Sequence, residues 1–132
     1  MKKILLDTNA YSYYLKGDQV VFNEIINSDR VYVSIFVMAE LLAGFKGGSK
    51  EKANRSILNK FLSKSTVEIL KAGIETSESF SEIKHALKSQ GTPIPINDVW
   101  IAAHVRESGA TLVTYDKHFE QISDLRIWDY PV

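Results

Sequence analysis

The chain has 132 residues, of which 45% are hydrophobic and 24% are charged, and its formal net charge at pH 7 is zero. These values are typical of one soluble globular domain, which we expect to span residues 1–132, and the absence of cysteine excludes disulfides, a thiol nucleophile and cysteine metal sites. No apolar stretch approaches the roughly 20 residues of a membrane span, and the apolar run after Lys3 is too short for a signal peptide, so we expect a cytoplasmic protein.

Strand-like and helix-like patterns alternate along the chain. In chain order they predict a strand at 3–6, helices at 9–16 and 20–27, a strand at 31–33, helices at 35–43 and 51–63, a strand at 67–70, helices at 74–90 and 97–107, a strand at 111–114 and a short edge strand at 125–128. We expect Thr8 or Asn9 to cap the first helix, Ser34 to cap the third, and Gly44 to end the third. Repeated β–α units with apolar strands predict a parallel sheet between helices, an α/β/α sandwich.

One segment departs from the neutral average. Residues 46–64 contain six basic side chains and one acidic side chain, a net charge of +5. Such a segment can contact the phosphates of a nucleic acid. It can equally be a helix whose lysines face water, and the sequence leaves both interpretations open.

Four carboxylates stand alone in apolar surroundings: Asp7, Glu40, Asp98 and Asp116. Asp7 ends the first predicted strand and Asp116 follows the fourth, whereas the other two lie in predicted helices. Parallel sheets bind ligands beyond the carboxyl ends of their strands, where the strand order reverses. If the first and fourth strands are neighbours there, all four acids meet at one rim.

Each acid also has a structural explanation when it is taken alone. Asp7 can accept hydrogen bonds from the next helix, Glu40 can reach water from an apolar helix, Asp98 can complement a helix dipole, and Asp116 can be a turn residue. A cluster is harder to explain, because two unit charges about 4 Å apart repel by roughly 4 kcal/mol at an effective dielectric of about 20. A cation removes that repulsion.

Oxygen-only ligands favour Mg²⁺ or Mn²⁺ over Zn²⁺, and such ions suit the hydrolysis of a phosphodiester. We therefore expect a catalytic metal site in which Asp7 and Asp98 are the strongest ligands, and Glu40 and Asp116 act through water or complete a second position. His118 follows Asp116 closely enough to reach the same rim. His85 and His104 do not point to it, and no zinc-protease, P-loop or G-x-S-x-G pattern is present.

Four segments, in this order, resemble the signatures of PIN-domain ribonucleases, and most closely VapC-type toxins of bacterial toxin–antitoxin pairs: Leu-Leu-Asp-Thr-Asn at 5–9, Ala-Glu-Leu-Leu-Ala-Gly at 39–44, Asn-Asp-Val-Trp-Ile-Ala-Ala at 97–103 and Leu-Val-Thr-Tyr-Asp-Lys-His-Phe at 112–119. The resemblance implies a five-stranded parallel sheet in the order 3-2-1-4-5. It also implies a Mg²⁺- or Mn²⁺-dependent endoribonuclease whose metal-centred acids are Asp7, Glu40, Asp98 and Asp116. Thr8 and Asn9 match polar neighbours in the signature, and Thr114 matches a hydroxyl residue that supports the acids.

The same resemblance implies partners. Family members are commonly homodimers that cut structured RNA such as tRNA or rRNA, and a small antitoxin inhibits them by laying its tail in a groove. In this chain we expect that groove at the loop 45–50 and the helix after it, with Tyr11 and Tyr14 nearby.

Other functions stay open on sequence grounds. One is an RNA- or protein-binding module of the same fold without activity. Another is a haloacid-dehalogenase-like phosphatase with Asp7 as nucleophile, but that family needs D-x-D where this chain has Asp7-Thr8-Asn9. A receiver domain lacks its paired acids here. The sequence does not distinguish one metal ion from two.

Overall fold

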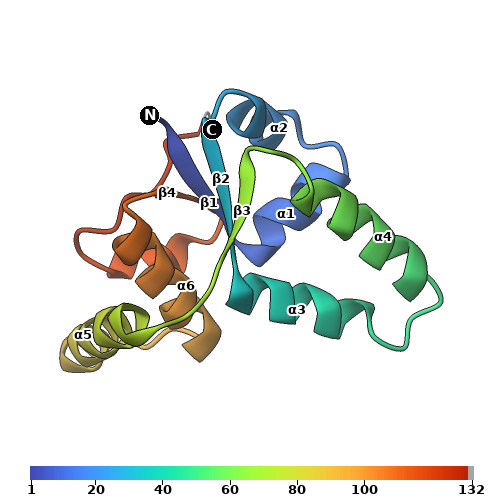
Figure 1. Cartoon of the computed structure of the whole chain (residues 1–132). Coiled ribbons are helices and arrows are strands. Elements are labelled where there is room, and N and C mark those ends of the chain that lie inside the picture. The colour runs from blue at the N-terminus through green and yellow to red at the C-terminus, as the bar shows by residue number, and fades with distance from the viewer. Residues whose placement is uncertain (131–132) are drawn as a thin grey trace.

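A computed structural model describes residues 1–130, which form a parallel sheet flanked by helices (Figure 1). The elements are β1 (Lys3–Leu6), α1 (Thr8–Leu15), α2 (Gln19–Ile26), β2 (Arg30–Ser34), α3 (Ile35–Phe45), α4 (Glu51–Leu62), β3 (Val67–Leu70), α5 (Ile74–Gln90), α6 (Ile96–Ser108), β4 (Thr111–Val113) and the 3₁₀ helix η1 (Lys117–Gln121). The four strands pair in the order β3-β2-β1-β4, all parallel, which confirms the predicted α/β class and the position of β1 beside β4.

The predicted fifth strand at 125–128 is wrong as an extended strand. Only Ile127 pairs there, through an isolated parallel bridge to Leu112. The chain reaches this position through a turn in which Asp124 has a φ of 61°. It then turns the Trp128 side chain inward, where the indole Nε1–H donates to the Thr114 carbonyl at 2.6 Å. Two backbone hydrogen bonds of Leu112, one accepted from the Trp128 N–H and one donated to the Arg126 carbonyl, and the buried Trp128 side chain therefore hold this edge.

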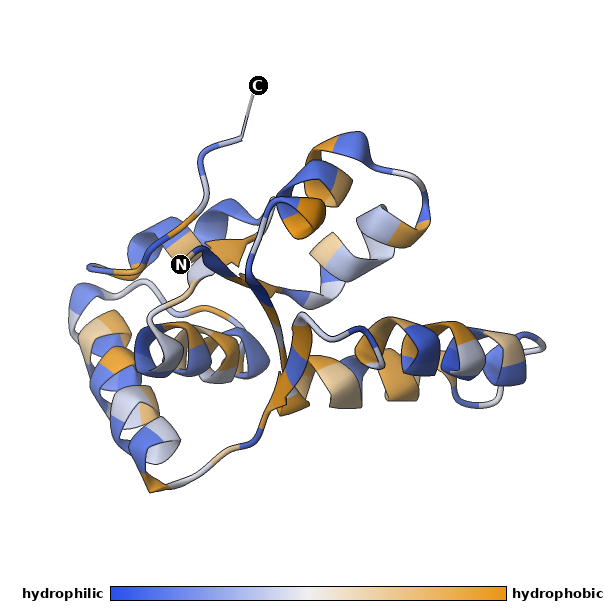
Figure 2. Ribbon diagram, turned by 45° about the horizontal axis from the view of Figure 1, so that its top comes forward, coloured by the Kyte–Doolittle hydropathy of each residue, from blue (hydrophilic) through white to orange (hydrophobic). Residues whose placement is uncertain are grey.

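The sheet is apolar on both faces. Ile4, Leu5 and Leu6 of β1 are fully buried, as expected for a strand covered on both sides. Figure 1 shows α5 and α6 on one side of the sheet and α1, α2 and α4 on the other. In Figure 2 the strands are mostly orange with short blue stretches, whereas the surrounding helices alternate between the two colours. No helix in residues 1–130 is long and apolar enough to cross a membrane.

The cap of the first helix and the end of the third differ from the prediction. The cap of α1 is Asp7, whose Oδ1 accepts from the Ala10 N–H at 2.8 Å. Ser34 caps α3 as predicted, with its hydroxyl oxygen accepting from the Phe36 N–H at 3.1 Å. However, α3 continues through Gly44 to Phe45, because the Lys46 N–H still donates to the Leu42 carbonyl at 3.0 Å. A glycine inside a helix costs only about 1 kcal/mol, so continued hydrogen bonding can outweigh it.

His104, in α6, is buried and joins three elements. Its Nε2 lies 3.1 Å from the Lys71 carbonyl and its Nδ1 lies 2.8 Å from the Ser34 hydroxyl. A carbonyl only accepts, so Nε2 carries the proton and Nδ1 accepts from Ser34. The neutral imidazole thus connects α6 to the end of β2 and to the segment after β3.

We expect His104→Gln to remove part of the acid sensitivity of the fold. Burial lowers the pKa of His104 below its ordinary value of 6.5. The unfolded chain therefore takes up a proton as the pH falls below 6.5 while the folded chain stays neutral, so this residue's contribution to the free energy of unfolding falls with the pH. Urea titrations at pH 7.5 and 5.5 should show the larger loss for the wild type. Equal losses in both proteins would contradict the assignment.

Candidate metal centre

Asp7 lies at the carboxyl end of β1 and is almost fully buried, with 3% of its surface exposed. Besides the Ala10 N–H, it accepts a hydrogen bond from the Thr114 hydroxyl on its second oxygen, Oδ2, at 2.5 Å. Burial raises the pKa of Asp7 to about 6, although these two hydrogen bonds lower it, and the negative charges of Asp116 and Asp98 raise it further. Hydrogen bonds thus hold the Asp7 carboxylate in one position, close to the negative charges of Asp116 and Asp98.

Thr114 joins the ends of two neighbouring strands, β1 and β4. Its hydroxyl donates to Asp7 after β1 and accepts from the Asp116 N–H at 3.0 Å after β4. Because β1 and β4 are adjacent in the sheet, this one side chain fixes the Asp7 carboxylate and the backbone of Asp116 at the same rim. The rim is the one where the strand order reverses, as in other open parallel sheets that bind ligands.

Asp98 approaches the same rim from the first turn of α6. Its Oδ2 lies 2.8 Å from Nε2 of His118. Burial raises the pKa of Asp98, His118 lowers it, and the charges of Glu40 and Asp116 raise it. His118 in η1 is therefore the side chain that holds Asp98 in place.

Glu40 is exposed on α3, but it is tied to the start of α1. The Thr8 hydroxyl donates to Glu40 Oε1 at 2.5 Å. Since Thr8 follows Asp7 directly, this bond holds Glu40 at the edge of the cluster. Asn9, the other polar residue of the expected signature, is exposed in the first turn of α1.

Comparisons with known proteins now bear on this geometry. The sequence profile of the PIN domain matches residues 4–125. The chain is 32% identical over 132 residues to Ribonuclease VapC1 of Haemophilus influenzae strain R2866, covering 96% of both chains. This chain belongs to the PIN-domain family, in its VapC branch. VapC proteins are nucleases, so the chain falls in the hydrolase class.

Other matches in the VapC branch extend over nearly the whole PIN domain. The chain is 28% identical over 133 residues to the tRNA(fMet)-specific endonuclease VapC of Salmonella typhimurium strain LT2, covering 98% of this chain and 99% of that protein. It superposes with a TM-score of 0.86 and 29% identity on a chain of VapBC2 from Rickettsia felis, solved bound to a promoter DNA fragment, over 98% of this chain and 99% of the other.

The four carboxylates of this PIN domain suit a hard divalent cation by their chemistry. All the acidic donors are oxygens, and their mutual repulsion is the condition that a cation relieves. Within residues 1–130, no three carboxylate, thiolate or imidazole side chains are arranged to hold a metal together. Mg²⁺ does not require that, because it keeps several waters and is usually bound through one or two carboxylates. The residues present therefore fit such an ion.

The rim also contains a contact that the sequence did not reveal. His118 was placed near Asp116 from their spacing, but its contact is with Asp98, 20 residues earlier in the chain. No local pattern encodes that pairing, because it depends on how η1 packs on α6. His104 lies on the same helix but bonds away from the rim, as described above.

We expect Thr114→Val to lower the free energy of unfolding by about 1–3 kcal/mol, because valine leaves the Asp116 N–H without its acceptor and Asp7 without a donor. Loss of that donor should raise the pKa of Asp7 further. Thr111→Val on the same strand is the matched control, since Thr111 makes no side-chain hydrogen bond within the described residues. Urea unfolding of both variants measures the difference. Equal effects would contradict the bridging role of Thr114.

Proposed function

We propose that this PIN domain is the toxin of a toxin–antitoxin pair and hydrolyses RNA phosphodiester bonds with Mg²⁺ or Mn²⁺. The observation that carries the proposal is the buried Asp7, whose pKa is raised by burial and by two further acids at the same rim. Such an arrangement is unfavourable for folding alone, and it favours a cation. The ribonuclease names of the similar VapC proteins support the same activity.

In this proposal Asp7 and Asp98 hold the cation. When bound, the ion supplies the positive charge that offsets the phosphate and the charge that develops on the leaving oxygen. Asp7 is already fixed through both of its oxygens, so little side-chain freedom is lost on binding. Glu40 and Asp116, at the rim of the cluster, accept hydrogen bonds from water, orient it towards the phosphate and can take its proton.

The basic segment 46–64 gives the RNA a counter-charge outside the acid cluster. It spans α4 and the loop before it, and α4 follows α3 as the second helix of a hairpin beside the sheet (Figure 1). Lys52, Arg55 and Lys60 are all exposed on α4. Contacts of these cations with phosphates would position the RNA without reading its sequence.

RNA cleavage by purified protein tests the activity. We expect Mn²⁺ or Mg²⁺ to be required and Asp98→Asn to lower the rate by at least about 100-fold, the scale of losing a catalytic electrostatic contact. Asp124→Asn is the matched control, because Asp124 is exposed and asparagine tolerates its φ of 61°. Cleavage that persists in excess EDTA, or that Asp98→Asn leaves intact, would overturn the proposed mechanism.

The alternative phosphatase has no support in the geometry. The second acid of D-x-D is replaced by Asn9, which is exposed.

We also propose that the partner is a cognate antitoxin whose apolar tail binds over α1, α2 and α4. Tyr14 packs there against Phe61 and Phe22, with ring centroids 5.3 and 6.5 Å apart. Phe22 and Ile57 leave 39% and 47% of their surfaces exposed. Phe22→Glu should reduce co-purification with the antitoxin while leaving metal-dependent cleavage intact. Undiminished co-purification would place the partner elsewhere.

A further inference from the structure

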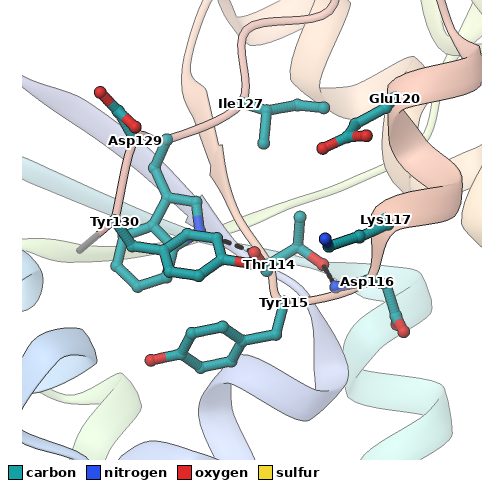
Figure 3. A pocket seen from close by; sticks show the side chains of 9 residues that line it. Thr114, Tyr115, Asp116, Lys117, Glu120, Ile127, Asp129 and Tyr130 are labelled. Carbon is teal, nitrogen blue, oxygen red and sulfur yellow. Dashed lines mark hydrogen bonds between the residues drawn. The ribbon is translucent and has the colours of Figure 1, made fainter. Parts of the chain in front are cut away.

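A pocket of about 220 Å³ lies directly beside the carboxylate cluster (Figure 3). It is lined by residues 114–117, Glu120 and residues 127–130. Thr114 and Asp116 therefore belong to both the pocket and the rim, and Figure 3 shows the Asp116 carboxylate directed away from the pocket. The volume is below the roughly 300–1,000 Å³ of pockets for drug-sized ligands, so it suits a single small ring system.

Three aromatic rings form one wall of the pocket. The Tyr115 ring centroid lies 5.4 Å from that of Trp128 and 4.9 Å from that of Tyr130, and the last two lie 5.1 Å apart. Hydrogen bonds fix two of these side chains, because the Tyr115 hydroxyl donates to Asp18 at 2.9 Å and the Trp128 indole donates to Thr114. A fixed aromatic wall binds a planar base with little loss of side-chain freedom.

Two charged side chains provide a polar edge opposite that wall. In Figure 3, Lys117 and Glu120 direct their charged ends into the pocket, whereas Asp129 directs its carboxylate away. A lysine only donates and a carboxylate only accepts. Guanine carries its O6 acceptor next to two donors, N1–H and N2–H₂, so it can pair with both side chains at once. Uracil has one N–H between two carbonyls, and those carbonyls would repel the Glu120 carboxylate.

We propose that this pocket binds one unpaired guanine of the RNA substrate, next to the phosphodiester that lies at the acids. The inference rests on the proposed ribonuclease function and assigns its sequence preference. Unpaired bases are the ones that proteins stack on aromatic side chains and read along their Watson–Crick edge. The shared residues Thr114 and Asp116 place the base within one nucleotide of the reacting phosphate.

The two tryptophans of the chain allow a direct test. Trp128 lines the pocket, whereas Trp100 is stacked on Phe80 in another part of the fold with ring centroids 3.9 Å apart. We expect guanosine 5′-monophosphate, added to the full chain without divalent cations, to shift the indole N–H NMR signal of Trp128 in a saturable way and to leave that of Trp100 in place. Uridine 5′-monophosphate should bind at least about tenfold more weakly, the scale of one good bidentate contact.

Variants separate stacking from reading of the base edge. Tyr130→Leu should weaken guanosine monophosphate binding about tenfold, and Glu120→Gln should reduce the preference over uridine monophosphate. Phe22→Leu, on α2, is the control aromatic replacement and should change neither.

The inference fails if the Trp128 indole signal does not shift with guanosine monophosphate, or if it shifts only when an antitoxin is added. It also fails if both nucleotides bind equally, or if Tyr130→Leu binds guanosine monophosphate like the wild type. RNA cleavage in Mn²⁺ is measured separately. Cleavage without selective nucleotide binding would overturn the guanine pocket alone, whereas selective binding without cleavage would support the pocket and overturn the proposed function.

Discussion

Asp7→Asn is expected to abolish RNA cleavage and at the same time to stabilise the metal-free protein by about 3 kcal/mol at pH 7.5. Asparagine keeps an oxygen for the Ala10 N–H, so the cap of α1 is retained. It removes, however, the buried charge whose cost is expressed in a pKa raised from 3.8 to about 6. A difference of that size corresponds to roughly 3 kcal/mol, since each unit is worth about 1.4 kcal/mol.

The pH dependence identifies the source of that gain. Between about pH 4 and pH 6 the folded chain holds the Asp7 proton more tightly than the unfolded chain, so the contribution of Asp7 to the free energy of unfolding falls as the pH rises through this window. Above about pH 6 this contribution of Asp7 no longer changes with pH. Urea titrations from pH 4 to 7.5 should show that the free energy of unfolding of the wild type, measured relative to that of Asp7→Asn, declines through this window, since the contribution of His104 is common to both proteins. Asp18→Asn, a cap replacement on α2, is the control and should bring no comparable gain. A destabilised Asp7→Asn at pH 7.5 would contradict the account.

The second large effect is stabilisation by a divalent cation. Mn²⁺ at 100 times its dissociation constant should add about 2.7 kcal/mol to the free energy of unfolding, which corresponds to a rise in Tm of roughly 10 °C for a domain of this size. The cation should do so because it offsets the cost of burying the Asp7 and Asp98 charges and their repulsion with neighbouring acids, which together raise the pKa values of both residues.

Thermal unfolding with and without Mn²⁺ measures the effect. The double variant Asp7→Asn with Asp98→Asn should show little or no rise in Tm, and Asp124→Asn should behave like the wild type. A rise that survives the double variant would mean that the cation binds away from these acids.

The sheet could be predicted from the sequence because its strands read as short apolar runs, and β1 is buried on both faces. The prediction failed at the edge of the fold. Residues 125–128 are apolar enough for a strand, but Trp128 is buried through its side chain and Ile127 alone pairs. The prediction that Gly44 ends α3 was also wrong, because hydrogen bonds at the end of this helix outweigh the preference of glycine for a helix end.

The four acids could be found because each is isolated among apolar residues, and a parallel sheet brings its strand ends to one rim. What holds them there could not be found. The hydrogen bond from Thr8 to Glu40 and the contact between His118 and Asp98 each join two helices, and their geometry depends on packing. The pocket beside Thr114 could not be predicted either, because its walls come from two separate segments, residues 114–120 and 127–130.

Anomalous diffraction from a crystal grown with Mn²⁺ is the most direct test of the central claim, because it locates the ion without reference to activity. The account predicts one or two anomalous peaks at the carboxyl ends of β1 and β4, within bonding distance of carboxylate oxygens of Asp7 and Asp98. Peaks only at other positions on the protein, or none at these acids at saturating Mn²⁺, would contradict it.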